Sequence, residues 1–339
     1  MCQNTSTYSL SQTIATGIFP SGAPTNATYS LSLIGCNSSG VPVNPVNYGW
    51  RCEESDLDTT GFVDLDFTLT TTQMVNGINI RMMFFSVTAT SNTSIFSTPL
   101  GKISWCNFDF TSTGVLTLGF LMTTTSEGMA NCQISMSGTS YARILTGSSS
   151  GNQLCNVRIK GDPSATTGTR YGLAMSLATA YPISTGRVFV CNVTGLGIIN
   201  YNAAANGGLI LSDATVVDCG TGVSVLGTTN ARLILSNVVI TGCTTGVNQS
   251  SGLYIFDNVV LRNTTDFGTA AELLVSEPCV FITTETDSQL YANSAIGDYR
   301  IKSTSAHWGK NRGAGDESSG SGNLELGVSI GRQLARTNI

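Results

Sequence analysis

The most constraining feature of this chain is an internal repeat. Residues 209–223 and 233–247 align without a gap at an offset of 24 residues, and a third copy starts at Tyr254, 21 residues after the second. Self-similarity at a period of this size marks a stacked repeat protein, in which each unit contacts only its neighbours. The units are too short and too rich in glycine and β-branched residues to be helix pairs. Each therefore predicts one coil of a parallel β-solenoid.

A short core of the repeat extends the pattern toward the N-terminus. Its order is apolar, small or polar, amide, apolar, any residue, apolar, and it recurs from Trp105, Asn131, Leu154 and Val190 as well as in the clear copies. The longest step between copies contains residues 162–184, which are rich in Thr, Ala, Gly and Pro, and we expect them to be a loop inserted between coils. The solenoid is predicted to occupy residues 61–285.

Two sets of positions follow from stacking the coils. Alternate residues of a strand point inward, and for one coil the predicted core positions are Leu233, Leu235, Val238, Ile240, Cys243 and Val247. A small polar residue recurs where two strands meet, and such side chains suit a corner because they hydrogen-bond nearby backbone groups. The predicted structural corner ladder consists of Asn107, Gln133, Asn156, Asn192, Asp213, Asn237 and Asn258. Its consecutive members from Asn192 onward should lie about 5 Å apart.

The chain has ten cysteines, and none of them shows the Cys-x-x-Cys spacing of a zinc site. Four share one repeat position and form a predicted cysteine column, facing out or lying at the corner: Cys106, Cys132, Cys155 and Cys191. We expect free stacked thiols there, with disulfide pairing as the alternative, because the strand spacing is at the loose end of disulfide geometry. Cys219 and Cys243 share a second column that should face inward. Cys36 and Cys52 are the pair to test first for a disulfide.

Composition excludes several classes of protein. Charged residues make up 11% of the chain, hydrophobic residues make up 41% and the net charge is −5. This is neither the signature of a disordered chain nor the basic face that nucleic acids require. No run of 18 apolar residues predicts a membrane span. The first residues lack the order of a secretory signal peptide, so we expect the chain to be made in a host cytoplasm and to leave by another route such as lysis.

The two ends of the chain do not carry the repeat. Residues 1–60 are rich in Ser, Thr, Asn and Pro, and they predict a separate attachment and capping region at the start of the tube. A solenoid end exposes backbone and core, so something must cover it. Residues 286–339 predict a C-terminal cap followed by an oligomerisation and contact segment. In that segment, we expect residues 313–322 to be a flexible turn or linker, and residues 324–330 alternate enough to predict a strand.

The repeat at residues 233–247 resembles a coil of the right-handed parallel β-helix found in the pectin-lyase-like superfamily. Residues 298–306 resemble the segment that closes many such helices, although the following Ala-His-Trp-Gly departs from the usual Ala-Gly turn. The resemblance implies an all-β, right-handed parallel β-helix with small appendages. Its members include polysaccharide lyases, glycosidases, bacterial adhesins, and bacteriophage tailspikes and capsid decorations. The low charge and the abundance of Gly, Ser, Thr and Asn are most similar to the phage group, whose spikes are usually homotrimers attached by one end.

The resemblance also sets a test for catalytic chemistry. The polygalacturonase-like pattern needs paired aspartates, Gly-His-Gly and Arg-Ile-Lys; Arg-Ile-Lys occurs at 158–160 and 300–302, but Gly-His-Gly is absent and His307 lies beyond the repeat. The outward column after the amide, which should carry acids in a lyase, reads Asp109, Ser135, Arg158, Thr194, Thr215, Val239 and Val260. Asp213 and Asp257 are two coils apart, which argues against a glycosidase pair. His307 and Trp308 are expected to pack the cap rather than to bind a sugar.

We therefore expect no catalytic, metal-binding or cofactor-binding residues and no cofactor. The sequence-based hypothesis is a bacteriophage virion structural protein, a homotrimeric β-helix that decorates the capsid or serves as a short adhesin spike on the virion surface. Its partners would be itself, capsid or other virion proteins and a host surface glycan, with no nucleic acid and no membrane. The alternatives are a polysaccharide-degrading lyase or glycosidase of the tailspike type and a bacterial cell-surface adhesin.

Overall fold

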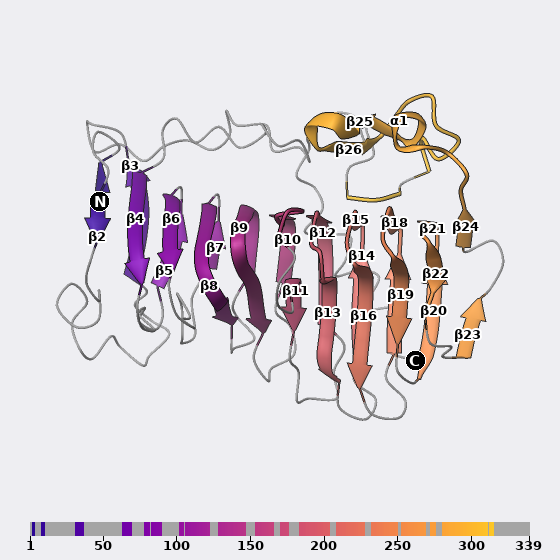
Figure 1. The fold of residues 1–339 in the computed structure, drawn as a ribbon, viewed down its shortest axis with the longest axis horizontal. Coiled ribbons are helices and arrows are strands. Elements are labelled where there is room, and N and C mark those ends of the chain that lie inside the picture. Colours follow the sequence, from indigo (N-terminus) through magenta and orange to yellow (C-terminus); the bar gives the residue numbers. More distant parts are fainter. Residues whose placement is uncertain are drawn as a thin grey trace.

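The computed structural model is a parallel β-solenoid, built almost entirely of strands that stack along one axis from the N-terminal to the C-terminal part of the chain (Figure 1). The stacking follows from the repeat, because each coil places its strands in hydrogen-bonding register with the coils before and after it. The structure describes residues 2–3, 8–10, 31–36, 63–69, 78–81, 83–89, 102–104, 106–122, 128–146, 153–165, 170–175, 183–203, 208–227, 232–249, 252–268, 272–275, 280–310 and 312–314.

The tube has three faces, and the first two belong to one 19-stranded sheet that bends between them. The first face contains β1 (Cys2–Gln3), β3 (Leu31–Cys36), β5 (Ile78–Arg81), β7 (Lys102–Ser104), β14 (Gly208–Ser212), β17 (Arg232–Ser236), β20 (Leu253–Asp257) and β23 (Glu272–Val275). The second contains β2 (Tyr8–Leu10), β4 (Val63–Leu69), β6 (Met83–Ala89), β8 (Asn107–Met122), β15 (Thr215–Val217), β18 (Val239–Thr241), β21 (Val259–Arg262) and β24 (Val280–Ile282).

Three long strands cross the bend and serve both faces: β9 (Gly128–Thr146), β10 (Gln153–Lys160) and β12 (Ile183–Cys191). The third face is a separate five-stranded parallel sheet of β11 (Tyr171–Met175), β13 (Leu196–Ala203), β16 (Thr221–Gly227), β19 (Thr245–Gln249) and β22 (Thr265–Phe267). β11 lies within the segment that was expected to be a loop. The described strands before residue 61 pair into the same sheet as the later coils, so that sheet starts earlier than the predicted boundary.

The interior of the tube is a continuous apolar core. Every position predicted to face inward in the coil from Leu233 to Val247 is at most 1% exposed. Cys219 and Cys243 lie in the same core, as expected. A column of glycines enters the third face, and a Cβ built on Gly222 would lie 2.5 Å from Ile240 Cγ2 and 2.7 Å from the Gly246 carbonyl oxygen. Close coil stacking at this position therefore requires glycine.

Two corners of the coil use left-handed backbone, which Asn, Asp and Gly tolerate better than other residues do. The first corner, between the first and second faces, consists of Asn131, Asn156, Arg187, Asp213, Asn237 and Asn258, with φ values between 46° and 57°. The second corner, between the second and third faces, contains Asn192, Asp218 and Gly242.

These corners correct the predicted ladder. Asn107 and Gln133 are in register with each other and with Arg158, two residues past the first corner, and Asn192 belongs to the second corner. Arg187 and Asn131 take the places expected for Asn192 and Gln133. The remaining predicted members lie at the first corner.

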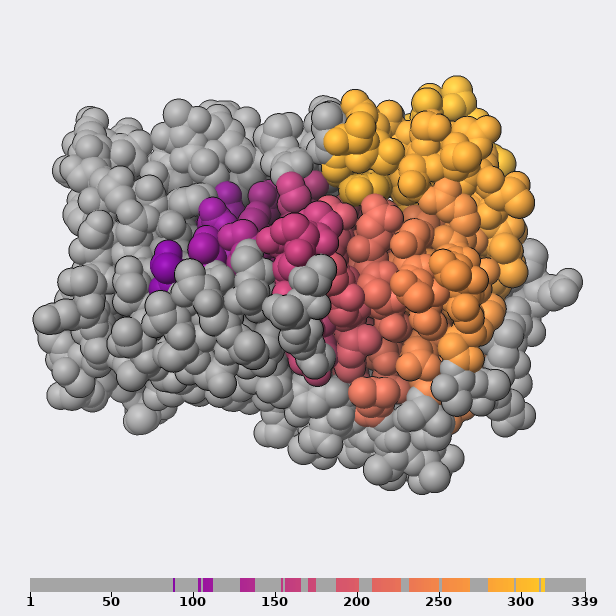
Figure 2. Space-filling model, in the orientation of Figure 1, coloured from indigo at the N-terminus to yellow at the C-terminus, as the bar shows by residue number. Residues whose placement is uncertain are grey.

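The described residues from 283 to 314 form a strap along the outside of the second face rather than a plug across the end of the tube. The strap contains α1 (Asp287–Leu290), β25 (Tyr291–Asn293), η2 (Ser294–Ile296) and β26 (Asp298–Ile301), with β25 and β26 antiparallel. It is the gold segment above β12 to β24 in Figure 1, and Figure 2 shows it lying against the flank of the tube. A second apolar core joins the two layers.

Candidate functional site

The strap covers a column of outward side chains on the second face. The column runs in register through Gln133, Arg158, Phe189, Thr215, Val239, Val260 and Phe281. It replaces the predicted outward column, because Asp109 and Ser135 are instead in register with Lys160. Val239 and Val260 are completely buried although they point away from the tube, since Leu290, Tyr291, Tyr299 and Ile301 of the strap pack over this face.

Both Arg-Ile-Lys sequences carry structural arginines. The Arg158 side chain is 1% exposed, its carbon Cζ lies 5.0 Å from the centre of the Phe189 ring, and its Nη2 donates to the Gly297 carbonyl oxygen at 3.2 Å. The Arg300 guanidinium pairs with Asp298 through Nε and Nη2, at 2.9 and 2.8 Å. The first arginine thus anchors the strap to β10, and the second orders the strap internally, so neither lies beside paired aspartates.

Polar contacts at the edge of the strap fix its register on the tube. The Tyr291 hydroxyl bonds the Thr241 hydroxyl within the buried interface, and the Tyr299 hydroxyl donates to Asp218 Oδ2 at 3.4 Å. Arg262 of β21 forms an ion pair with Asp287 at the start of α1. Burial raises the pKa of Asp218, and the nearby Asp287 carboxylate raises it further, while the Tyr299 hydrogen bond opposes both effects.

His307 lies inside the strap and not on an open surface. The residue is 8% exposed, its Nδ1 contacts Arg312 Nη1, and its ring lies edge-on to Phe281. Arg312 also stacks on Phe281, with 3.7 Å between its Cζ and the ring centre. Burial lowers the pKa of His307, the Arg312 charge lowers it further, and Glu285 opposes both. These contacts make His307 a packing residue of the strap, and Trp308 packs against the same core.

The first corner carries a ladder of side-chain hydrogen bonds that ends on the strap. Asn237 Nδ2 donates to Asp213 Oδ1 at 3.1 Å, Asn258 Nδ2 donates to Asn237 Oδ1 at 2.8 Å, and Arg312 Nε donates to Asn258 Oδ1 at 2.6 Å. A separate rung joins Asn156 to Asn131 at 2.8 Å. Burial raises the pKa of Asp213, while the Asn237 hydrogen bond and the Arg187 charge oppose the rise.

The predicted cysteine column is not one column. Cys106 and Cys132 lie one coil apart and face the tube core, whereas Cys191 faces outward beneath the strap and is in register with Lys160 and Val217. Cys155 is in register with Ala130 and Gly186 on the first face. Cys106, Cys132, Cys191, Cys219 and Cys243 are buried and are not joined in disulfides. The predicted Cys36–Cys52 pair lies outside this description, because Cys52 and the Cys36 side chain are not among the described residues.

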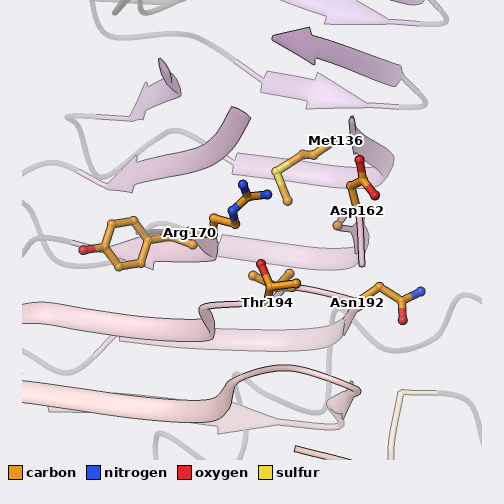
Figure 3. A pocket seen from close by; sticks show the side chains of 8 residues that line it. Met136, Asp162, Arg170, Asn192 and Thr194 are labelled. Carbon is orange, nitrogen blue, oxygen red and sulfur yellow. The ribbon is translucent and has the colours of Figure 1, made fainter. Parts of the chain in front are cut away.

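A small pocket lies beside the second corner, between β9 and β11 (Figure 3). Arg170 and Met136 point toward one another, and Asn192 points away from them. Arg170 is 4% exposed, and burial lowers its pKa against the opposing charge of Asp162. The cavity volume of about 10 Å³ matches one water molecule. This pocket can hold one water molecule beside the buried Arg170, but it is too small to admit a sugar.

The first face leaves an apolar ladder in the outward direction. Ile210, Ile234 and Ile255 are stacked in register on β14, β17 and β20, and Ile255 is 36% exposed. We call these three residues the isoleucine strip. Exposed Arg232 stands at the start of β17 and exposed Asp257 at the end of β20, so charges of opposite sign flank the strip.

Comparisons with known proteins give no relative: no family model, curated protein or solved structure matches this chain. Among the described residues, no three His, Cys, Asp or Glu side chains are arranged to hold a metal ion. Within the same part of the chain, no helix is long and apolar enough to cross a membrane.

Neither the covered surface of the second face nor the isoleucine strip of the first face was predicted, although the sequence carries a signal for both. Strands that are buried on one side alternate apolar and polar residues, whereas strands buried on both sides read as continuous apolar runs. Residues 238–240 and 259–261 are such runs on the second face, and they lie under the strap. Residues 209–211 and 233–235 are the same kind of run on the first face.

Proposed function

We propose that this protein is a structural component of a bacteriophage particle, a rod that stands on the virion surface and acts by binding rather than by catalysis. The observation that supports this proposal most is the solid construction of the rod. The tube core is continuous from Ile103 to Leu261, and the strap packs along the outside of the second face. The side chains that could suggest polysaccharide chemistry, Arg158, Arg300 and His307, are used to hold that strap in place.

The low charge of the chain and its abundance of Gly, Ser, Thr and Asn support a particle component, as does the resemblance of its repeat to a superfamily of β-helices that includes phage spikes. We propose that it works as a homotrimer, with capsid or other virion proteins at the attached end and a host glycan as a further ligand. The N-terminal end is the proposed attachment end. Among the described strands, β1 and β2 each pair on one side only, and sheet edges of this kind need a partner or a cover.

The test is to look for the chain in purified phage particles by mass spectrometry and to locate it in a reconstruction of the particle. The proposal predicts rods at the virion surface, three around a local axis. The purified protein should release neither reducing ends nor unsaturated uronates from host polysaccharide. Absence from particles would refute the proposal. Glycan cleavage that is lost on changing a single outward Asp would favour the enzyme alternative.

A further inference from the structure

We infer that the isoleucine strip is the surface through which copies of this chain pack side by side, with their tube axes parallel. The inference deepens the proposed function, on which the number of three copies rests, by assigning the contact surface and its polarity. It starts from a comparison of two faces that share one sheet. Both carry apolar triplets, so the middle residue of each triplet points outward and needs a cover.

On the second face that cover is visible. Val239 and Val260 point outward and are fully buried beneath the strap. On the first face the equivalent side chains of Ile210 and Ile234 are half-buried, and Ile255 is 36% exposed. Stacked coils place these isoleucines about 4.8 Å apart in a straight line. A line with this spacing fits best against another line with the same spacing, and a second copy of the chain provides one.

Charge at the two margins of the strip selects the orientation. Arg232 and Asp257 stand at opposite ends of neighbouring strands, separated along the strand direction by about 13 Å, the length of four residues. Because all strands on this face run in one direction, rotation about an axis parallel to the tube brings the end of a strand in one copy against the start of a strand in the next. Asp257 of one copy then faces Arg232 of its neighbour.

In an antiparallel arrangement of tubes, strand starts would face strand starts and strand ends would face strand ends. Arg232 would then lie opposite Arg232, and Asp257 opposite Asp257. The parallel arrangement also puts the same ends of all copies on the same side. A rod attached to a surface by one end requires this polarity.

The experiment measures the mass of the purified full chain by sedimentation and light scattering at micromolar concentration. We expect the wild type to form an oligomer. The double variant Ile234→Thr/Ile255→Thr, which keeps β-branched side chains on the strands, should dissociate with a loss of affinity of about 100-fold. The matched control is Leu226→Thr on the third face, where a leucine of similar exposure, 38%, is replaced. This control should leave the oligomer unchanged.

A charge exchange tests the parallel arrangement. Arg232→Asp and Asp257→Arg should each weaken assembly, and the two changes together should restore it. A monomeric wild type, an oligomer that survives the double isoleucine change, or a charge exchange that fails to restore assembly would overturn the inference. Those results would leave the presence of the rod on virions untouched. Conversely, a chain that assembles through the strip but is absent from virions would refute the proposed function alone.

Discussion

The ladder at the first corner gives the sharpest test of the energetics of the tube, through Asn237. This residue has a φ of 56°, donates to Asp213 and accepts from Asn258. Asn237→Ala removes two hydrogen bonds, each contributing about 1 kcal/mol to the free energy of unfolding, or about 2 kcal/mol when a charged group accepts. It also places a Cβ-bearing residue without a local hydrogen bond in left-handed backbone, at about 1–2 kcal/mol. We expect a total loss of about 4 kcal/mol.

Asn237→Gly separates the two contributions, because glycine loses the same hydrogen bonds but adopts left-handed backbone without strain. Part of that advantage is cancelled by the greater freedom of glycine in the unfolded chain, so we expect the glycine variant to be about 1 kcal/mol more stable than the alanine variant. Urea unfolding followed by circular dichroism measures both. The control is Asn293→Ala, an exposed asparagine with a φ of −159°, which should cost less than about 0.5 kcal/mol. An alanine variant as stable as the glycine variant would refute the role given to the backbone.

Three further changes test the core, the coil spacing and the strap. Val238→Asp should cost several kcal/mol because it buries an unpaired charge, whereas Thr245→Asp on a half-exposed strand should cost little; equal melting temperatures would contradict the inward assignment. Gly222→Ala should cost about 1–3 kcal/mol by forcing neighbouring coils apart, and an unchanged melting temperature would show that the coils can yield. Burial gives folded His307 a pKa below its unfolded value, so the stability that depends on the neutral ring is complete above about pH 6.5 and falls as the pH decreases from there. Trp308 fluorescence should report the loosening of the strap. The variant His307→Gln should abolish this contribution to the pH dependence of stability.

The solenoid and its core were predictable because they depend on a local pattern repeated many times. Alternation within residues 233–247 identifies the inward side chains directly, and each neighbouring coil repeats the same information. The corner ladder was harder to predict for a physical reason. Each coil has two corners that favour left-handed backbone, so an asparagine after a cysteine marks the first corner at Asn156 and the second at Asn192. Only the strand register distinguishes the two.

The place of the strap could not be derived from its own sequence. Residues 298–301 alternate and resemble a closing segment, but the pattern does not say which surface they cover. That choice depends on contacts with residues far away in the sequence, such as the Arg158 hydrogen bond to Gly297. The outward valines of β18 and β21 indicate that a cover is needed and where it must lie. They do not indicate which segment of the chain supplies it.

The span of the strap has a consequence for how this protein unfolds. A stack of similar coils with only nearest-neighbour contacts can fray one unit at a time. Here the strap bonds β10 through Arg158, β15 through Thr215 and the corner just before β21 through Asn258, so a single segment holds all of these coils. Loss of any one coil would release contacts that hold the others. We therefore expect the coils from β10 to β21 to open as one cooperative block and to show similar protection in hydrogen exchange. During folding, the strap should dock only after the last of these coils has stacked.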